Sequence, residues 1–287
     1  MGRPRVAPPR VFPEASRAAK PPTGAAGAID AHRQTAFVLG AEADLVVDSL
    51  RIEGAVAAAS SGAKHRTQQM VSALGLWSRA WLSRLEALHA VEWGNYPAAV
   101  TLIRAAADYQ AAELYLLRHD AAEWVEWLDQ GGIALAPEEH ATKYDLHAFR
   151  AAEILAAHEI LGPLYRATMD LSMPHFGATL LLAGNDSSPE RVLMTFGDRD
   201  FHLGLAELSL GWLMELAVAQ ADALMEFDSV FSIEDRAAVE AHLGAARAAV
   251  SRRERCSVEA VDRDGMKRYL VHNWRRGPGS AAKKLLL

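Results

Sequence analysis

The chain has 287 residues, of which 51% are apolar and 23% charged, and its net charge is −6. This composition excludes a wholly disordered chain and allows one large core. The single cysteine, Cys256, excludes an intrachain disulfide and a cysteine-built metal site. No run of eighteen apolar residues occurs, and the N-terminus lacks the apolar stretch of a signal peptide. We therefore expect a cytoplasmic protein without a membrane-spanning segment.

Positive charge is concentrated at the two ends of the chain. Residues 1–20 carry +4 and residues 266–287 carry +6, so residues 21–265 carry −16. An acidic body with basic ends predicts tails that fold back, on this or a neighbouring subunit, or that bind an acidic partner. The partner would be a protein or a nucleic acid such as RNA. We expect these tails over residues 1–28 and 256–287.

The first half of the body has apolar residues at helical spacing. Runs over residues 29–60 and 64–93 predict two long helices, the second with Trp77 on its apolar stripe. After the NYP break, Pro97 suits the first turn of a third helix, which we expect to end near residue 119.

Shorter helices are predicted in the middle of the chain. A cap-like spacing predicts one over residues 120–127, and Pro137 opens another over residues 138–161. Gly162 with Pro163 is expected to interrupt the chain, and Pro174 to break the segment that follows.

The last third of the chain is also predicted to be helical. A loop near residues 184–190 precedes a strongly apolar helix over residues 200–228, which suits the centre of a bundle. Ser232 with Asp235 resembles a capping box for a helix to about Arg255. No segment shows convincing strand alternation, although CSVEAV could be a short extended piece. We therefore predict an all-α fold, a single bundle of about seven or eight helices over residues 29–255.

The common catalytic and metal-binding motifs are absent. Glu86 and His89 form one Glu-x-x-His, which is half of a di-iron site, but no second copy exists. Asp198 and His202 form an Asp-x-x-x-His, where Asp198 is more simply a helix cap. Since no glycine-rich phosphate loop, Gly-x-Ser-x-Gly or His-Glu-x-x-His occurs either, we expect no metal and no cofactor.

Arg104 and Asp108 lie one turn apart on the otherwise apolar third helix. On a helical wheel they share a face with Thr101, Ala111 and Tyr115. A solvated pair of this kind contributes only a few tenths of a kcal/mol. A buried pair is costly unless further partners satisfy both groups, which would make it a candidate site. The sequence leaves both readings open.

This region resembles a known group of proteins. The stretch GNYPAAVTLIRAAADYQAAELYLL, followed at a distance by LYRATMDLSMPHF with Ser172 and His175, is similar to a family of uncharacterised bacterial all-helical proteins. That family is often placed near the HEPN-type helical domains of defence and toxin systems, some of which cut RNA. The resemblance covers roughly residues 70–225.

The resemblance implies a candidate catalytic set of Arg104, Asp108 and His175 meeting between helices, with Arg166 nearby. His175 would act as general base or acid on a ribose hydroxyl, while Arg104 or Arg166 would stabilise phosphate charge. A histidine near a helix break can equally buttress a loop.

Three functional hypotheses follow. The first, which we favour, is a non-catalytic helical interaction protein whose basic tails mediate association with its own copies or with a partner. The second is a HEPN-like ribonuclease or nucleotide-binding protein that uses Arg104, Asp108 and His175; an acidic body suits RNA cutting poorly. The third is a pocket for an apolar ligand, suggested by the many tryptophans, although core packing explains these more simply. The tryptophans concerned are Trp77, Trp81, Trp124, Trp127 and Trp212.

Overall fold

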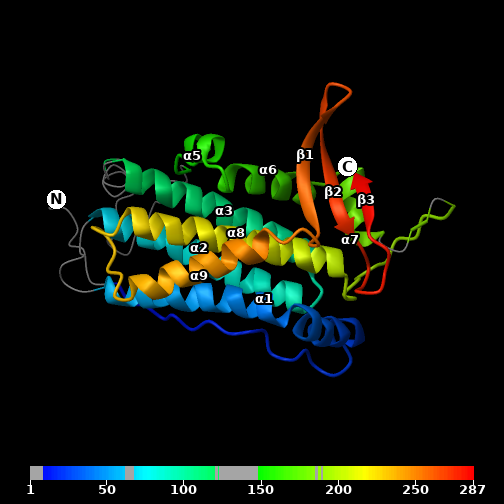
Figure 1. The fold of residues 1–287 in the computed structure, drawn as a ribbon, viewed down its shortest axis with the longest axis horizontal. Coiled ribbons are helices and arrows are strands. Elements are labelled where there is room, and N and C mark those ends of the chain that lie inside the picture. The colour runs from blue at the N-terminus through cyan, green and yellow to red at the C-terminus, as the bar shows by residue number, and fades with distance from the viewer. Residues whose placement is uncertain (1–8, 62–67, 120–121, 123–147, 185–186, 189) are drawn as a thin grey trace, which may run out of the picture.

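Helices dominate the protein in the computed structural model (Figure 1). The structure describes residues 9–61, 68–119, 122, 148–184, 187–188 and 190–287. Within these ranges the helices are α1 (Ala26–Ala59), α2 (Gln68–Glu92), α3 (Tyr96–Arg118), α5 (Ala152–Ala157), α6 (Leu161–Ser172), α7 (Phe176–Ala183), α8 (Leu203–Glu226) and α9 (Arg236–Val250). Three strands follow: β1 (Ser257–Arg263), β2 (Met266–Trp274) and β3 (Lys283–Leu286).

Four long helices, α1, α2, α3 and α8, lie lengthwise around one core, as the apolar periodicity predicts (Figure 1). Helix α9 packs on α1 and α8, while α5 and α6 pack on α3. Alanines without exposed surface line the helix contacts and let the backbones approach closely, for example Ala43, Ala80 and Ala107. Larger apolar side chains such as Leu88 and Leu210 fill the space between them.

The turn between α2 and α3 holds the end of the bundle together. Gly94 has φ +68°, and a Cβ there would clash with the carbonyl oxygen of Arg199, so only glycine is compatible with this turn. The Arg199 guanidinium also donates to the carbonyl oxygen of Trp93 at 2.9 Å. Pro97 stands in the first turn of α3, which confirms its predicted role.

The middle of the chain differs from the prediction. The short helix over residues 120–127 and the first part of the helix over 138–161 lie almost wholly outside the described residues. Where the structure is described again, residues 148–151 are not helical and α5 covers only Ala152–Ala157. The interruption falls before Leu161 and not at Gly162 and Pro163, because both lie in the first turn of α6, where proline is tolerated. The break at Pro174 between α6 and α7 is confirmed.

The capping residues of α8 and α9 also differ. The backbone N–H of Leu205 donates to the His202 imidazole at 3.2 Å, so His202 caps α8 where Asp198 was expected. Asp235, and not Ser232, is the N-cap of α9, and its carboxylate accepts from the N–H of Ala238 at 2.9 Å. Helix α9 ends at Val250, before the expected position.

The all-α prediction is incomplete, because residues 257–286 form a three-stranded antiparallel sheet in the order β1-β2-β3. The β1–β2 hairpin projects beyond the helices in Figure 1. Asp264 and Gly265, with φ of 56° and 73°, join the two strands as a two-residue turn between the paired residues Arg263 and Met266. The segment expected to be a basic C-terminal tail over residues 256–287 thus contains a sheet.

Buried residues and hydrogen bonds fasten this sheet to the bundle. Trp274 is only 8% exposed, and its ring centroid lies 4.4 Å from that of His202. The carbonyl oxygens of Arg275 and Arg276 accept from the first N–H groups of α8, at Gly204 and Leu203, with distances of 3.0 and 2.9 Å. These contacts satisfy donors that a helix cannot pair internally.

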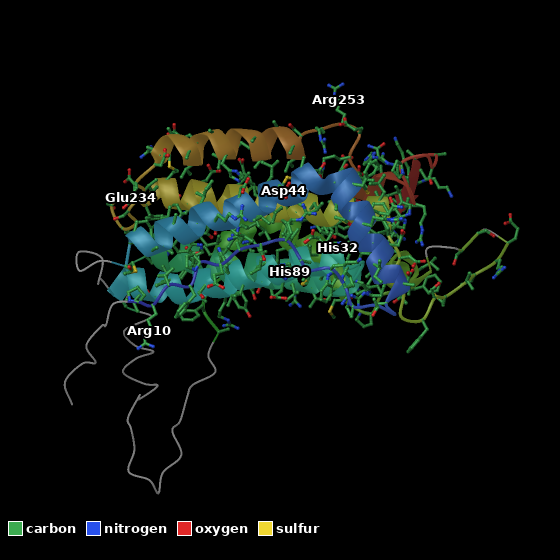
Figure 2. All side chains as sticks on the ribbon, turned by 90° about the horizontal axis from the view of Figure 1, so that it is seen from below. Arg10, His32, Asp44, His89, Glu234 and Arg253 are labelled. Atoms are coloured by element: carbon green, nitrogen blue, oxygen red, sulfur yellow. The ribbon has the colours of Figure 1, made fainter. Side chains whose placement is uncertain are left out.

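Residues 10–22, which we call the N-terminal strap, contain no regular element and run along α1 and α2 (Figure 2). The Arg17 guanidinium binds the carboxylates of Glu92 on α2 and, at 2.8 Å, of Asp44 on α1. The backbone N–H of Ala18 donates to Glu92 at 2.6 Å. The strap therefore bridges the two helices.

The Glu86 and His89 pair contributes to this surface and not to a metal site. The His89 imidazole bonds the strap carbonyl oxygen of Ser16 at 2.9 Å, and its other nitrogen lies 3.9 Å from the Glu86 carboxylate. Over the described ranges, no three His, Cys, Asp or Glu side chains gather in a group that could hold a metal ion.

Helix α8 is long and apolar enough to cross a membrane by length and composition, and 78% of its apolar window is buried in the protein. A core helix of a bundle has the same composition. No other helix in the described part of the chain meets this criterion.

Candidate functional site

A large groove lies between α7 and the C-terminal sheet. Its volume is about 930 Å³. We call it the C-terminal groove. Its lining includes side chains of α6 and α7 on one side and of β2, β3 and the chain terminus on the other, among them His175, Phe176, Tyr269, Leu285 and Leu287.

Four cationic side chains line this groove: Lys267, Arg268, Lys283 and Lys284. None of them forms an ion pair or a side-chain hydrogen bond with a described residue. The only acidic side chain among the described lining residues, Asp170, already accepts the Tyr269 hydroxyl at 2.6 Å. The side chains that line the groove therefore carry an excess of positive charge.

The Tyr269 hydroxyl remains neutral and acts as a hydrogen-bond donor. Burial raises its pKa, and its hydrogen bond to the Asp170 carboxylate raises it further. The proton is therefore held between the two side chains, and the tyrosine is no candidate base at neutral pH.

Exposed apolar side chains surround the same end of the molecule. Phe176 at the start of α7 is 76% exposed, and Phe196, in the loop that follows α7, is fully exposed. This loop is held against α7 by a hydrogen bond from the N–H of Thr195 to the carbonyl oxygen of Ala183 at 2.8 Å. Met173, Val192, Met194 and Leu286 are also exposed here. Of these residues, Phe176 and Leu286 line the groove itself, and exposed apolar groups beside a groove mark a surface that other molecules cover.

Three of the four predicted catalytic residues lie on another face, formed by α3, α5 and α6. Asp108 and Arg166 line one open cavity of about 580 Å³, together with Tyr165. The guanidinium carbon of Arg104 lies 5.8 Å from the centroid of the Tyr165 ring, at the outer limit of a cation–π contact. Arg104 is half-buried and Arg166 is exposed.

The Arg104–Asp108 pair is not a closed salt bridge, because no ion pair or hydrogen bond joins the two side chains. Burial raises the pKa of Asp108, and the positive charges of Arg104 and Arg79 lower it in part. Arg79 is itself held by the Tyr109 hydroxyl at 2.5 Å. Both side chains are thus half-buried, which lies between the solvated pair and the buried pair that the sequence left open.

His175 does not join the other three residues. It occupies the N-cap position of α7, is exposed, and lines the C-terminal groove. Its carbonyl oxygen accepts from the N–H of Thr179 at 2.9 Å. The expected meeting of Arg104, Asp108 and His175 between helices is therefore not what the structure shows.

A buried polar cluster inside the bundle was not anticipated. Glu53 of α1 accepts from Arg84 at 2.8 Å and from the Trp77 indole at 2.9 Å, and both charged side chains are at most 2% exposed. Glu113 of α3 accepts from the Gln220 amide of α8 at 2.9 Å. Glu53 and Trp77 also line a pocket beneath the N-terminal strap, and we assign the Glu113–Gln220 pair to the core.

A local signal existed for each of these missed features. Arg84 falls on the same helical stripe as Trp77 and Trp81, where a charged residue must find a buried partner. The Asp264-Gly265 dipeptide is a strong hairpin signal. The groove cations were counted as part of a basic tail, and only the sheet places them on one surface.

We compared the chain with known protein families, curated proteins and solved structures. No family model matches the chain, and neither a curated protein nor a solved structure matches it.

Proposed function

We propose that this is a non-catalytic helical interaction protein that binds an acidic protein partner, its own copies included, through the C-terminal groove. The observation that carries the proposal is a groove bordered by exposed apolar side chains and lined by four cations, none of which has an ion-pair partner among the described residues: Lys267, Arg268, Lys283 and Lys284. Cations attract and orient an acidic partner, and apolar contacts supply most of the binding free energy.

An acidic protein suits the groove better than nucleic acid does. Nucleic-acid-binding proteins usually have a continuous basic track, whereas residues 21–265 carry −16. Phe176 and Leu286 present apolar surface beside the cations, and apolar side chains of an acidic protein complement such a surface. The acidic body also makes a second copy of the chain an eligible partner.

The test is binding of a fluorescein-labelled peptide of alternating Glu and Leu, followed by fluorescence anisotropy in a salt series. The double variant Lys283→Glu, Lys284→Glu is expected to bind at least about tenfold more weakly at low salt, because attraction becomes repulsion. The control is Lys20→Glu with Arg253→Glu, which changes the net charge equally at exposed sites outside the groove.

Equal loss in both double variants would show a general charge effect and would refute the groove as the binding surface. The same conclusion follows if the unmodified protein does not bind the peptide at low salt.

A second candidate function is a HEPN-like ribonuclease or nucleotide-binding protein, and the positions of the predicted catalytic residues favour it in part. Asp108 and Arg166 share a cavity beside Arg104, and His175 stands in a cationic groove of the kind that attracts phosphate. The separation of His175 from the other three residues argues against a single catalytic centre.

This candidate predicts cleavage of single-stranded RNA by the full-length protein and loss of cleavage in His175→Ala. His175 is exposed, so the substitution should leave the fold intact. Thermal unfolding followed by circular dichroism checks this. RNA that stays intact at every salt concentration tested would exclude ribonuclease activity.

A further inference from the structure

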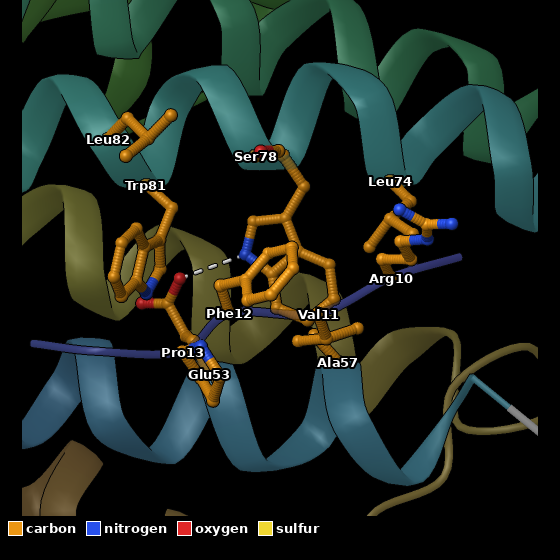
Figure 3. Close-up of a pocket in the computed structure, with 12 residues that line it drawn as sticks. Arg10, Val11, Phe12, Pro13, Glu53, Ala57, Leu74, Ser78, Trp81 and Leu82 are labelled. Atoms are coloured by element: carbon orange, nitrogen blue, oxygen red, sulfur yellow. Dashed lines mark hydrogen bonds between the residues drawn. The ribbon is translucent and has the colours of Figure 1, made fainter.

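The N-terminal strap covers an apolar pocket between α1 and α2 (Figure 3). The pocket has a volume of about 300 Å³, at the lower end of the range of roughly 300–1,000 Å³ for small-molecule sites. Ala57 of α1 and Leu74, Trp77 and Trp81 of α2 form its walls. Two of the tryptophans noted in the sequence therefore line a pocket, and they do not only fill the core.

Strap residues close the outer side of this pocket. Val11, Phe12 and Pro13 pass over it in Figure 3, and all three belong to its lining. Phe12 is 78% exposed, although it lies next to an apolar space that could accommodate part of it. Hydrogen bonds anchor the strap further along the chain, at Arg17 and Ala18, and Pro13 packs directly against Gly54 of α1.

The charges at the pocket are asymmetric. Glu53 lies at the inner side, but Arg84 neutralises it and the Trp77 indole donates to it at 2.9 Å. Arg10 lies at the opening, is exposed, and forms no ion pair or side-chain hydrogen bond with a described residue. A ligand thus meets an apolar interior, a neutralised ion pair and one free positive charge.

We propose that this pocket binds a small amphiphile with one acidic head group, such as a medium-chain fatty acid. The apolar body would lie against Trp77, Trp81 and Ala57, and the carboxylate would bind the Arg10 guanidinium at the opening. The binding free energy comes from burial of the apolar body, and the head group determines its orientation. This proposal does not depend on the C-terminal groove.

The experiment is titration of the full-length protein with decanoate, followed by tryptophan fluorescence and isothermal calorimetry. We expect saturable binding with a stoichiometry of one. Arg10→Gln should weaken it about tenfold, the loss expected for a charge-assisted hydrogen bond near the surface. Ala57→Leu should fill the pocket and abolish binding. Arg253→Gln is the matched control, because Arg253 projects into solvent far from the strap (Figure 2).

Decanol distinguishes head-group recognition from simple apolar binding. We expect decanol to bind more weakly than decanoate, and equally to the unmodified protein and to Arg10→Gln. Equal affinity for decanol and decanoate would overturn the proposed recognition of an acid. Absence of decanoate binding, or unchanged binding in Ala57→Leu with an intact thermal unfolding profile, would overturn the pocket as the site.

Discussion

Glu113 on α3 is enclosed by the bundle, and burial raises its pKa to about 8. The Gln220 hydrogen bond and the Arg84 charge lower the pKa, but the nearby Glu53 carboxylate raises it again. The side chain is therefore mostly protonated at neutral pH. Its second oxygen has no hydrogen-bond partner among the described residues, which adds to the cost of a charge at this position.

This raised pKa predicts how stability depends on pH. An unfolded glutamate has a pKa of 4.5, so between pH 4.5 and about 8 the folded state holds the proton that the unfolded state releases. The free energy of unfolding must then fall as pH rises through this window. In Glu113→Gln the fall should be smaller by about 2 kcal/mol or more between pH 5 and pH 8.

Urea unfolding of both proteins at the two pH values measures this difference. Glu215, whose pKa burial raises to about 7, contributes a slope of the same sign in both proteins and cancels in the comparison. Parallel pH dependence in the two proteins would contradict a buried, protonated Glu113.

At the scale of elements, the junction between the bundle and the sheet depends on Arg255. This residue is 3% exposed and binds the Glu42 carboxylate on α1 and, at 2.5 Å, the carbonyl oxygen of Glu207 on α8. Arg275 binds the Glu207 side chain at 2.7 Å. One buried guanidinium therefore connects α1, α8 and the segment that enters β1.

Arg255→Leu should lower the free energy of unfolding by about 3 kcal/mol, because it leaves the buried carbonyl oxygen of Glu207 without this donor and removes one of the two arginines that bind Glu42. Chemical denaturation measures the loss, and Arg253→Leu at the exposed neighbouring position is the control. A change below about 0.5 kcal/mol, the range of ordinary surface substitutions, would show that the junction does not depend on this residue.

At the scale of the whole molecule, the basic ends and the acidic middle are separate in the sequence, but the fold brings some of their charges into contact. Arg17 of the N-terminal strap binds acidic residues of α1 and α2, so part of the basic N-terminus is neutralised by the protein itself. The cations of β2 and β3 that line the C-terminal groove have no ion-pair partner in the part of the chain that the structure describes. We therefore expect a partner to bind at the C-terminal groove, and the salt series of the peptide experiment measures how far binding depends on the charge of the groove cations.

The sequence by itself determined the positions of the long helices, because a helix repeats its apolar face every 3.6 residues and Pro97 and Pro174 act on the local backbone. It did not reveal the sheet. Strand β1 is exposed over most of its length and so lacks the alternation that identifies a strand. The local signs of the hairpin were the CSVEAV segment, which suits a short extended piece, and the Asp264-Gly265 turn.

Only the tertiary structure decided which side chains meet. Arg104 and Asp108 are neighbours by helical spacing, but the separation of His175 depends on how α6 and α7 pack and on where the C-terminal sheet lies. The basic residues near the C-terminus are visible as a count in the sequence. Their assembly into one groove requires the pairing of β2 with β3 and the burial of Trp274 against α8, contacts between residues far apart along the chain that no local pattern specifies.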